Sequence, residues 1–280
     1  GYNQDTSSAK QADLLKEAVS VAKQSDVSVV VIGEYESEDG EGKDRSDLNL
    51  DENQEKLVEA IHAAGKPVVV VMENGRPLTI TWIAKNIPSI VETWYAGEKS
   101  GYAIADVLLG NVNPSGKLPV TFPRSVGQIP YYYDHKPTSF HRYIDEAKTP
   151  LFAFGRGLSY TTFRYTDLKI SPSNIPVNGK ATVSVQIENT GKVEGTEVVQ
   201  LYVRDKVSSV TTPILALKGF SRITLKPGES GTVHFEIGRD ALSLWNREMK
   251  HVVEPGMFSI KVGSSSDDIR LQGNLTVDKK

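Results

Sequence analysis

The chain has 280 residues, about two domains by length, and each half is long enough to bury its own core. Hydrophobic residues make up 39% of it and charged residues 24%, which is ordinary globular usage and excludes a largely disordered chain. The formal charge of −3 leaves no basic excess to neutralise phosphates, so neither nucleic acid nor an anionic membrane surface is expected as the main partner.

The first half of the chain alternates helical and extended patterns. Residues 9–24 carry apolar side chains at helical spacing, namely Ala12, Leu15, Ala18, Val19 and Ala22. Residues 27–33 then form a continuous apolar run of strand length. A strand that is apolar on both faces is typical of a sheet that is covered on both sides, and such sheets are usually parallel.

A second helix is predicted to begin at Asp51, where Gln54 three residues later completes the sequence pattern of a capping box. Gly65 is expected to end this helix in a left-handed conformation. The apolar face of the helix comprises Leu57, Val58, Ile61 and Ala64. Further elements are predicted at residues 68–71 (strand), 90–94 (strand) and 103–109 (helix). Strands connected through helices indicate a right-handed α/β layer with a mostly parallel sheet.

After residue 162 the apolar period changes to two, which is typical of half-buried strands. The alternating apolar residues are Val183, Val185, Ile187, Val199, Leu201, Val203, Val233, Phe235, Ile237, Phe258, Ile260 and Val262. This pattern predicts an antiparallel β-sandwich of the fibronectin type III-like class, because the absence of cysteine excludes a disulfide-bonded immunoglobulin domain. The predicted boundaries are 1–135 for the α/β domain, 136–162 for a linker and 163–280 for the sandwich.

One connection in the α/β layer is unusually long. Some seventeen residues separate Gly33 from the helix cap at Asp51, whereas such loops usually have about 2–6. The loop contains seven carboxylates and two cations: Glu34, Glu36, Glu38, Asp39, Glu41, Asp44, Asp47, Lys43 and Arg45. Open α/β sheets place their sites at the carboxyl ends of parallel strands, which makes this loop the candidate functional segment.

Three interpretations of the loop remain open on the residues alone. The first is a solvated acidic surface loop. The second, an EF-hand calcium loop, is disfavoured because the frames set by Gly40 and Gly42 both fail to end in glutamate. The third is catalysis by one carboxylic acid, since crowded acids raise one another's pKa and the two glycines would let the backbone carry Glu41 into a cleft. Spacing alone does not separate Glu41 from the other glutamates of the loop: Glu34, Glu36 and Glu38.

Several longer runs resemble the second domain of family 3 glycoside hydrolases and the fibronectin type III-like domain that follows it. These runs are Glu41-Gly42-Lys43-Asp44-Arg45, Asn74-Gly75-Arg76-Pro77-Leu78, Asn113-Pro114-Ser115-Gly116-Lys117-Leu118-Pro119, Phe154-Gly155-Arg156-Gly157-Leu158-Ser159-Tyr160 and Leu217-Lys218-Gly219-Phe220. The likeness covers nearly the whole chain and is closest to bacterial periplasmic β-glucosidases. It implies a retaining, exo-acting β-glycosidase, with β-glucosidase as the first expectation and a periplasmic or secreted location.

The resemblance implies one catalytic residue in this chain. The family's acid/base glutamate lies on a loop of the second domain, in an acidic stretch followed by an Asp-Arg pair, and Glu41 before Asp44 and Arg45 matches that place. Arg45 is expected either to orient the loop by pairing with Asp44, Asp47 or another acid, or to form a surface ion pair. Trp94 and Tyr95 are expected to be core and packing residues rather than platforms for sugar binding.

The resemblance also implies what lies outside this chain. The family's nucleophile is an aspartate on a preceding (β/α)8 barrel, and its second domain begins with a further strand and loop, so the α/β domain is expected to be incomplete at its start. The expected partner is an amino-terminal, barrel-containing chain, and the expected substrates are β-linked glucosides or short oligosaccharides. No cofactor and no metal site are expected. The alternatives are the same fragment of a β-xylosidase and a non-catalytic, carbohydrate-associated interaction module.

Overall fold

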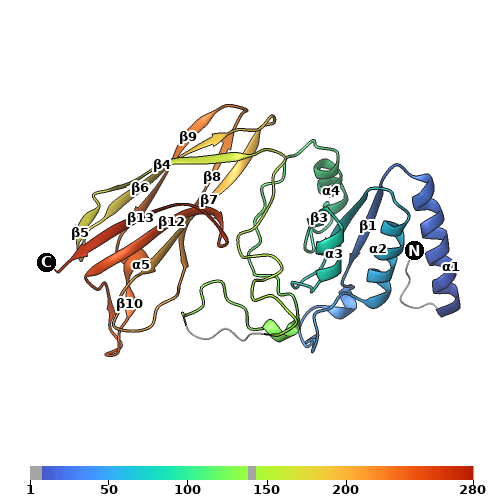
Figure 1. Cartoon of the computed structure of the whole chain (residues 1–280), viewed down its shortest axis with the longest axis horizontal. Helices are drawn as coiled ribbons and strands as arrows, with labels where there is room; N and C mark the ends of the chain where they lie inside the picture. The colour runs from blue at the N-terminus through green and yellow to red at the C-terminus, as the bar shows by residue number, and fades with distance from the viewer. Residues whose placement is uncertain (1–7, 138–142, 280) are drawn as a thin grey trace. The chain divides into compact units, whose positions relative to one another are not determined.

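The structure is a computed structural model that describes residues 8–137 and 143–279. They form two compact units, each with its own sheets (Figure 1). The first unit comprises residues 8–108, 122–130 and 143–151. The second comprises residues 109–121, 131–137 and 152–279. The domain boundaries at 135 and 162 stay a prediction. Within the described ranges, no helix is both long and apolar enough to cross a membrane.

The first unit is built on a parallel sheet, as the alternating pattern predicted. Its strands are β1 (Ser28–Gly33), β2 (Val68–Glu73) and β3 (Ser89–Glu92), in the order β1-β2-β3. Its helices are α1 (Ser8–Gln24), α2 (Glu52–Ala63), α3 (Thr81–Asn86) and α4 (Ser100–Leu108), with short 3-10 turns η1 (Glu36–Glu38) and η2 (Val126–Gln128). Helix α1 packs on α2, and α2 packs on β1 and β2 (Figure 1). Helix α3 was not predicted, because six residues are too few to display a helical period.

The helix cap at Asp51 forms as predicted, but Gln54 does not complete the capping box. The Asp51 carboxylate accepts hydrogen bonds from the backbone N–H groups of Asn53 at 2.9 Å and Gln54 at 3.4 Å. The Gln54 side chain instead reaches β1, where its Nε2 donates to the Gly33 carbonyl at 2.9 Å and its Oε1 accepts the Gly33 N–H at 2.8 Å. The amide thus satisfies both backbone groups at the point where the acidic loop begins.

Strand β1 differs from the fully buried strand that its apolar run predicted. Val30 and Ile32 are buried, but Val29 is 48% exposed and Val31 is 55% exposed. A cavity of about 710 Å³ lined by residues of α1, β1 and α2 opens on this strand. β1 is an edge strand of the sheet. Burial on both faces is seen in the central strand β2 and not in β1.

The second unit is a β-sandwich of a five-stranded sheet, β5-β13-β12-β7-β8, and a three-stranded sheet, β4-β6-β9. Neighbouring strands are antiparallel except β5 and β13, which are parallel. The elements are β4 (Phe163–Ser171), β5 (Asn174–Pro176), β6 (Ala181–Asn189), β7 (Gly195–Asp205), β8 (Ala216–Leu225), β9 (Ser230–Ile237), α5 (Arg239–Leu242), β10 (Leu244–Trp245), β11 (His251–Val252), β12 (Gly256–Ser265) and β13 (Asp268–Asp278). β10 and β11 pair as a small separate hairpin.

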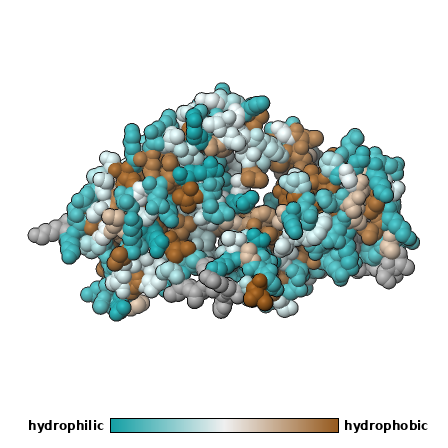
Figure 2. All heavy atoms as spheres, in the orientation of Figure 1, coloured by the Kyte–Doolittle hydropathy of each residue, from teal (hydrophilic) through white to brown (hydrophobic). Residues whose placement is uncertain are grey.

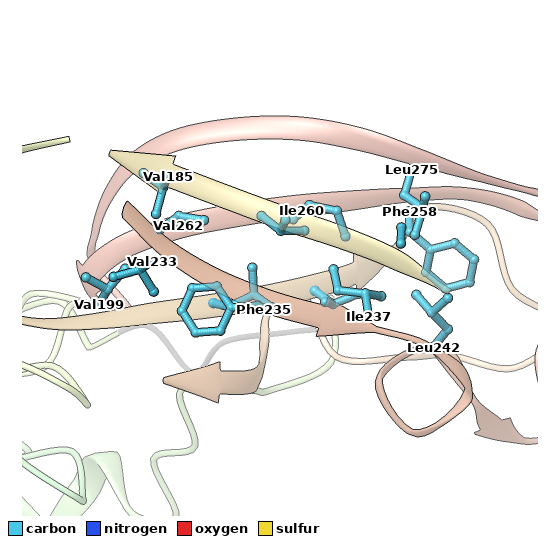
Figure 3. Packing of buried hydrophobic residues seen from close by; sticks show 14 of the residues in the cluster. Val185, Val199, Val233, Phe235, Ile237, Leu242, Phe258, Ile260, Val262 and Leu275 are labelled. Carbon is cyan, nitrogen blue, oxygen red and sulfur yellow. The ribbon is translucent and has the colours of Figure 1, made fainter. Parts of the chain in front are cut away.

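The core of the sandwich confirms the period-two prediction. All twelve residues that alternate in the sequence are buried. Figure 3 shows Phe235 and Ile237 of β9 turned toward the same interior as Phe258 and Ile260 of β12. By contrast, the face drawn in Figure 2 is mostly hydrophilic, with hydrophobic residues in separate groups. The alternation therefore marked the residues that the fold removes from water.

Candidate functional site: an anchored acidic loop

The acidic loop leaves the carboxyl end of β1 and returns to the cap of α2. It contains only one regular turn, η1, and one bridge to the rest of the unit, in which Asn49 pairs with Thr79. The neighbouring strand β2 ends beside it, since the Glu34 N–H donates to the Glu73 carbonyl at 2.9 Å. The loop therefore stands at the edge of the parallel sheet where sites are expected.

Glu34, the first residue of the loop, is a buried anchor. Its side chain is 1% exposed and lies 3.2 Å from Arg45 Nη1 and 2.9 Å from Arg76 Nε. The contact with Arg76 Nε is an ion pair whose geometry is not that of a linear hydrogen bond. The other oxygen, Oε2, accepts the Gly75 N–H at 3.3 Å. A buried carboxylate that is paired with two guanidinium groups has a structural role, because its lone pairs are already engaged.

Arg76 ties the middle of the loop to the end of β2. Its Nη2 donates to Asp39 Oδ1 at 2.7 Å and to the Glu38 carbonyl at 3.0 Å, and its Nη1 donates to the Lys43 carbonyl at 3.0 Å. One planar guanidinium thus holds the loop at Glu38 and Asp39 and again at Lys43, and it also pairs with Glu34.

Gly75 permits this close approach. A Cβ at this position would lie 2.1 Å from Asp39 Oδ2, so any other residue would displace the Asp39 carboxylate that pairs with Arg76. Arg45 adds a second tie, because its Nη2 donates to the Asn49 carbonyl at 3.0 Å. The expectation that Arg45 pairs with an acid is confirmed, and that acid is Glu34.

Glu41 lies at the exposed tip of the anchored loop, between Gly40 at φ 119° and Gly42 at φ 74°. Both angles are in the region that favours glycine, so the backbone at the tip depends on these two residues. In the described part of the chain, no polar group lies within hydrogen-bond distance of the Glu41 carboxylate. Its side chain is therefore exposed, and its oxygens have no hydrogen-bond partner among the described residues.

The other glutamates of the loop differ in this respect. Glu34 is buried in its ion pairs, and Glu38 Oε2 accepts the Tyr35 N–H at 3.1 Å. Glu36 is exposed like Glu41. Glu34 and one oxygen of Glu38 are thus engaged, whereas Glu36 and Glu41 are exposed and have no hydrogen-bond partner among the described residues.

A second carboxylate, that of Glu92, lies next to the turn that contains Arg76. Glu92, at the end of β3, accepts the Trp94 N–H at 3.0 Å and the Asn74 side-chain amide at 3.4 Å. Burial raises the pKa of Glu92 to about 7, although these two hydrogen bonds act in the opposite direction. Asn74 also donates to the Arg76 carbonyl at 2.9 Å, so Glu92 supports the turn that carries the anchor.

The two aromatic residues after β3 have different environments. Trp94 is half-buried and packs against Phe122, with ring centroids 5.8 Å apart, as expected. Tyr95 is 47% exposed, so the expectation that it packs in the interior is wrong. Burial and the nearby acids of the loop, Asp39 and Glu34, raise the pKa of Tyr95.

The sequence analysis missed Arg76 as the main anchor and Glu34 as its partner. The run from Asn74 to Leu78 entered only as part of the family resemblance. The sequence signal that could have predicted this anchor is an arginine, Arg76, directly after the strand that neighbours β1. The carboxyl ends of adjacent parallel strands lie at the same edge of the sheet, so Arg76 was to be expected near the loop.

Comparison with known proteins gives the family. Residues 4–160 match the Glycosyl hydrolase family 3 C-terminal domain, and residues 197–266 match the Fibronectin type III-like domain. The chain is 55% identical over 262 residues to a β-xylosidase from Formosa agariphila, covering 91% of this chain and 36% of that protein. It is 47% identical over 273 residues to a periplasmic β-glucosidase from Salmonella typhimurium, covering 94% of this chain and 36% of that protein.

Solved structures agree with this result. A β-glucosidase from Erythrobacter marinus superimposes with a TM-score of 0.92 at 40% identity, over 99% of this chain and 38% of that one. A β-glucosidase from Listeria innocua in complex with glucose superimposes with a TM-score of 0.90 at 32% identity, over 98% of this chain and 39% of that one. The chain thus spans little more than a third of the length of these relatives. By its sequence and by its fold it belongs to glycoside hydrolase family 3, of which it holds the C-terminal domain and the fibronectin type III-like domain.

Proposed function

We propose that the chain is the carboxyl-terminal part of a retaining, exo-acting β-glycosidase and that Glu41 is its general acid/base. The observation that carries the proposal is the contrast between the tip of the loop and its base. Arg76 and Arg45 hold the base through Glu34 and Asp39, while the Glu41 carboxylate projects with no partner among the described residues. A proton donor must be held in position and must also be free to reach the substrate.

The retaining reaction needs two carboxyl groups about 5–5.5 Å apart, one a nucleophile and one an acid/base. In the proposed mechanism Glu41 protonates the glycosidic oxygen as the nucleophile attacks the anomeric carbon, and the leaving group departs as an alcohol. Glu41, now a carboxylate, takes a proton from the water that attacks the glycosyl-enzyme. The nucleophile would come from an amino-terminal, barrel-containing partner.

The exposure of Glu41 supports a need for that partner. A general acid keeps its proton near neutral pH only where burial or neighbouring negative charge disfavours the carboxylate. The tip of the loop is exposed, so the covering surface would have to come from the partner and the bound sugar. On its own, the chain is therefore expected not to hydrolyse an aryl β-glucoside above background.

We propose β-linked glucosides or short oligosaccharides as substrates, because the relatives include several named β-glucosidases, two of them solved with glucose. A β-xylosidase is the second candidate, favoured by the 55% identity to the protein of that name. The relative named periplasmic β-glucosidase supports a periplasmic or secreted location. A non-catalytic, carbohydrate-associated module is the alternative, and such a module would give no leaving-group dependence at Glu41.

The test is the change Glu41→Ala in an enzyme assembled from this chain and its barrel-containing partner. Turnover of substrates with poor leaving groups should fall by about 10²–10⁴-fold, because these groups need protonation to depart. Activated aryl glycosides should lose much less in the first step. Added azide should restore their turnover, because it attacks the glycosyl-enzyme without help from a base.

Glu36→Ala is the matched control, since Glu36 is exposed on the same loop. It should leave both the leaving-group dependence and the azide response unchanged. If Glu36→Ala shows the two effects and Glu41→Ala does not, the assignment is wrong by five residues. If neither change shows them, the acid lies elsewhere.

A further inference from the structure

Glu92 is a carboxylic acid of the first unit that the proposed reaction does not use. It is the last residue of β3, and in the parallel sheet it lies opposite Met72 of β2. Its side chain is partly buried, and no described lysine, arginine or histidine lies within ion-pair distance of it. Burial without a cationic partner favours the protonated acid over the carboxylate, and the pKa of Glu92 is raised to about 7 accordingly.

The side-chain amide of Asn74 connects Glu92 with the turn that carries Arg76. Asn74 is fully buried, and its Nδ2 donates to the Arg76 carbonyl at 2.9 Å and to Glu92 Oε2 at 3.4 Å. The shorter bond fixes the orientation of the amide, because a flipped amide would place Oδ1 against the Arg76 carbonyl, and both atoms only accept. Asn74 Oδ1 is buried and has no hydrogen-bond partner among the described residues. The turn thus contains a buried acceptor that lacks a donor.

A proton on Glu92 would supply that donor. Glu92 Oε1 accepts the Trp94 N–H at 3.0 Å, which leaves Oε2, on the side of Asn74, to carry the proton. The protonated acid can then accept from Trp94 and donate to Asn74 Oδ1, while the Asn74 nitrogen stays on the Arg76 carbonyl. Ionisation removes the donor and leaves a carboxylate whose partner in this turn is the Asn74 nitrogen. The carboxylate would therefore draw that nitrogen away from the Arg76 carbonyl.

Arg76 carries this change to the acidic loop. Its guanidinium pairs with Asp39 on one side of the loop tip and donates to the Lys43 carbonyl on the other side. The segment between these two contacts is 40–42, with Glu41 at its centre. A shift of the turn that holds Arg76 would therefore loosen both ends of the tip at once.

Other charged groups around Glu92 do not replace this connection. Titratable or charged residues of the neighbouring elements are Glu73 and Arg76 on β2 and its turn, Glu34 and Asp39 in the loop, and Tyr95 after β3. In the described structure, none of their side chains lies within hydrogen-bond or ion-pair distance of the Glu92 carboxyl group. The charges of Glu34 and Asp39 are already paired with Arg76. The protonation state of Glu92 thus reaches the loop through Asn74.

We propose that Glu92 is a positioning residue for Glu41: the protonated acid holds the loop through Asn74 and Arg76, and the ionised acid releases it. The effect on catalysis rests on the proposed function of Glu41, whereas the effect on the loop concerns this chain alone. The loop is held below neutral pH and released above it. In the assembled enzyme, turnover therefore falls at alkaline pH for a reason that is separate from the ionisation of Glu41 itself.

The first test is hydrogen exchange of the full chain, with Glu92→Gln compared with the unaltered chain at the same pH. Glutamine imitates the protonated acid, since its oxygen can accept the Trp94 N–H and its nitrogen can donate to Asn74 Oδ1. In residues 34–50, the ratio of the exchange rate of the unaltered chain to that of the variant should rise between pH 5.5 and pH 8.5. The rise should reach at most about thirtyfold, the value for an opening that returns the pKa of Glu92 from about 7 to 4.5.

Glu55→Gln is the matched control. Burial and the neighbouring Glu59 also raise the pKa of Glu55, but Glu55 lies on α2 and has no described contact with the turn. This substitution should leave the exchange of residues 34–50 unchanged at both pH values. Asn74→Ala removes the connection, so the loop should exchange faster at both pH values, and Glu92→Gln should then have no further effect. Circular dichroism checks the fold, and if Asn74→Ala does not fold, the comparison of Glu92→Gln with Glu55→Gln decides.

The second test is the pH profile of the enzyme assembled with its barrel-containing partner. Glu92→Gln should move the alkaline fall of kcat to higher pH and should leave the leaving-group dependence unchanged. The proposal is overturned if the exchange ratio is the same at pH 5.5 and pH 8.5, or if Glu55→Gln changes the exchange as much as Glu92→Gln does. An unmoved pH profile beside a positive exchange result would overturn the role in catalysis. Failure of the Glu41→Ala experiment would instead refute the acid/base assignment and leave the hold of Glu92 on the loop intact.

Discussion

The base of the acidic loop and the core of the sandwich are stabilised by opposite means. The loop base is held by buried charges, with Glu34 between Arg45 and Arg76. The sandwich core is held by apolar burial, with residues such as Val185 and Ile260 fully buried. Charge pairs depend on geometry and orientation, whereas apolar burial depends mainly on area and shape.

This difference indicates what each region is suited to do. A guanidinium with several fixed donors places one loop in one position, because each donor needs its acceptor at the correct angle. An apolar core stabilises a scaffold but tolerates small shifts among similar side chains. We therefore expect changes of charge to act on the loop and changes of volume to act on the sandwich.

The largest effect is expected from Ile260→Ala in the core. Ile260 is fully buried on β12, and removing its side chain leaves a cavity that the close-packed sheets cannot fill. The sandwich should lose about 2–5 kcal/mol of stability. Hydrogen exchange followed by mass spectrometry should show faster exchange in peptides of β7 and β12 and no change in residues 34–50. Faster exchange in the loop would contradict the separation of the two regions.

The next effect is expected from Arg76→Met at the loop base. The change keeps much of the side-chain volume but leaves Glu34 buried with Arg45 alone and frees Asp39. Removing one partner of a buried ion pair typically lowers the stability by about 3–5 kcal/mol. Because Arg45 still pairs with Glu34, the loss here should be smaller. Peptides from residues 34–50 should exchange faster, while β7 and β12 should not change.

Lys56→Met is the control for that experiment. Lys56 pairs with Glu52 on the surface of α2, where both side chains are more than half exposed. A surface pair contributes about 0–1 kcal/mol, so exchange should hardly change. An equal effect of the two substitutions would mean that the buried charges do not hold the loop.

A smaller, pH-dependent effect is expected from Glu92→Gln. The pKa of Glu92 is raised from 4.5 to about 7, so the folded chain keeps a proton that the unfolded chain has released. The stability due to this group is complete below about pH 4.5 and is lost as the pH rises through 7, by about 3 kcal/mol at most. Glutamine cannot ionise, so the variant should lose this pH dependence in urea unfolding of the first unit between pH 5 and pH 8. An unchanged pH profile would show that Glu92 is ionised throughout.

The smallest effect is expected from Val31→Thr. Val31 is 55% exposed on β1, so the change removes no packed contact, and the stability of the chain should shift by less than about 0.5 kcal/mol. Binding of a dye that reports on apolar surface should decrease, because Val31 lies in an exposed row with Val27 and Val29. A large loss of stability would mean that this row is packed.

The sequence by itself determined the classes of the two regions. The period of two after residue 162 predicted the twelve buried residues of the sandwich, because neighbouring residues on a strand face opposite sides. The apolar runs at β1 and β2 predicted the parallel sheet, and the length of the segment after Gly33 marked the loop that we propose as functional. Local patterns of this kind report burial directly, since they arise from the geometry of one element.

Only the tertiary structure decided how the loop is held. Glu34 and Arg76 are far apart in the sequence, and no local pattern pairs a given carboxylate with a given arginine among the many charges. Gln54 matched a local capping pattern, but its side-chain amide forms two hydrogen bonds with the backbone of Gly33, twenty-one residues away at the end of β1. The exposure of Val29 and Val31 likewise depends on what lies beside β1. Long-range pairing is decided by which groups the fold brings together, and a one-dimensional pattern does not contain that information.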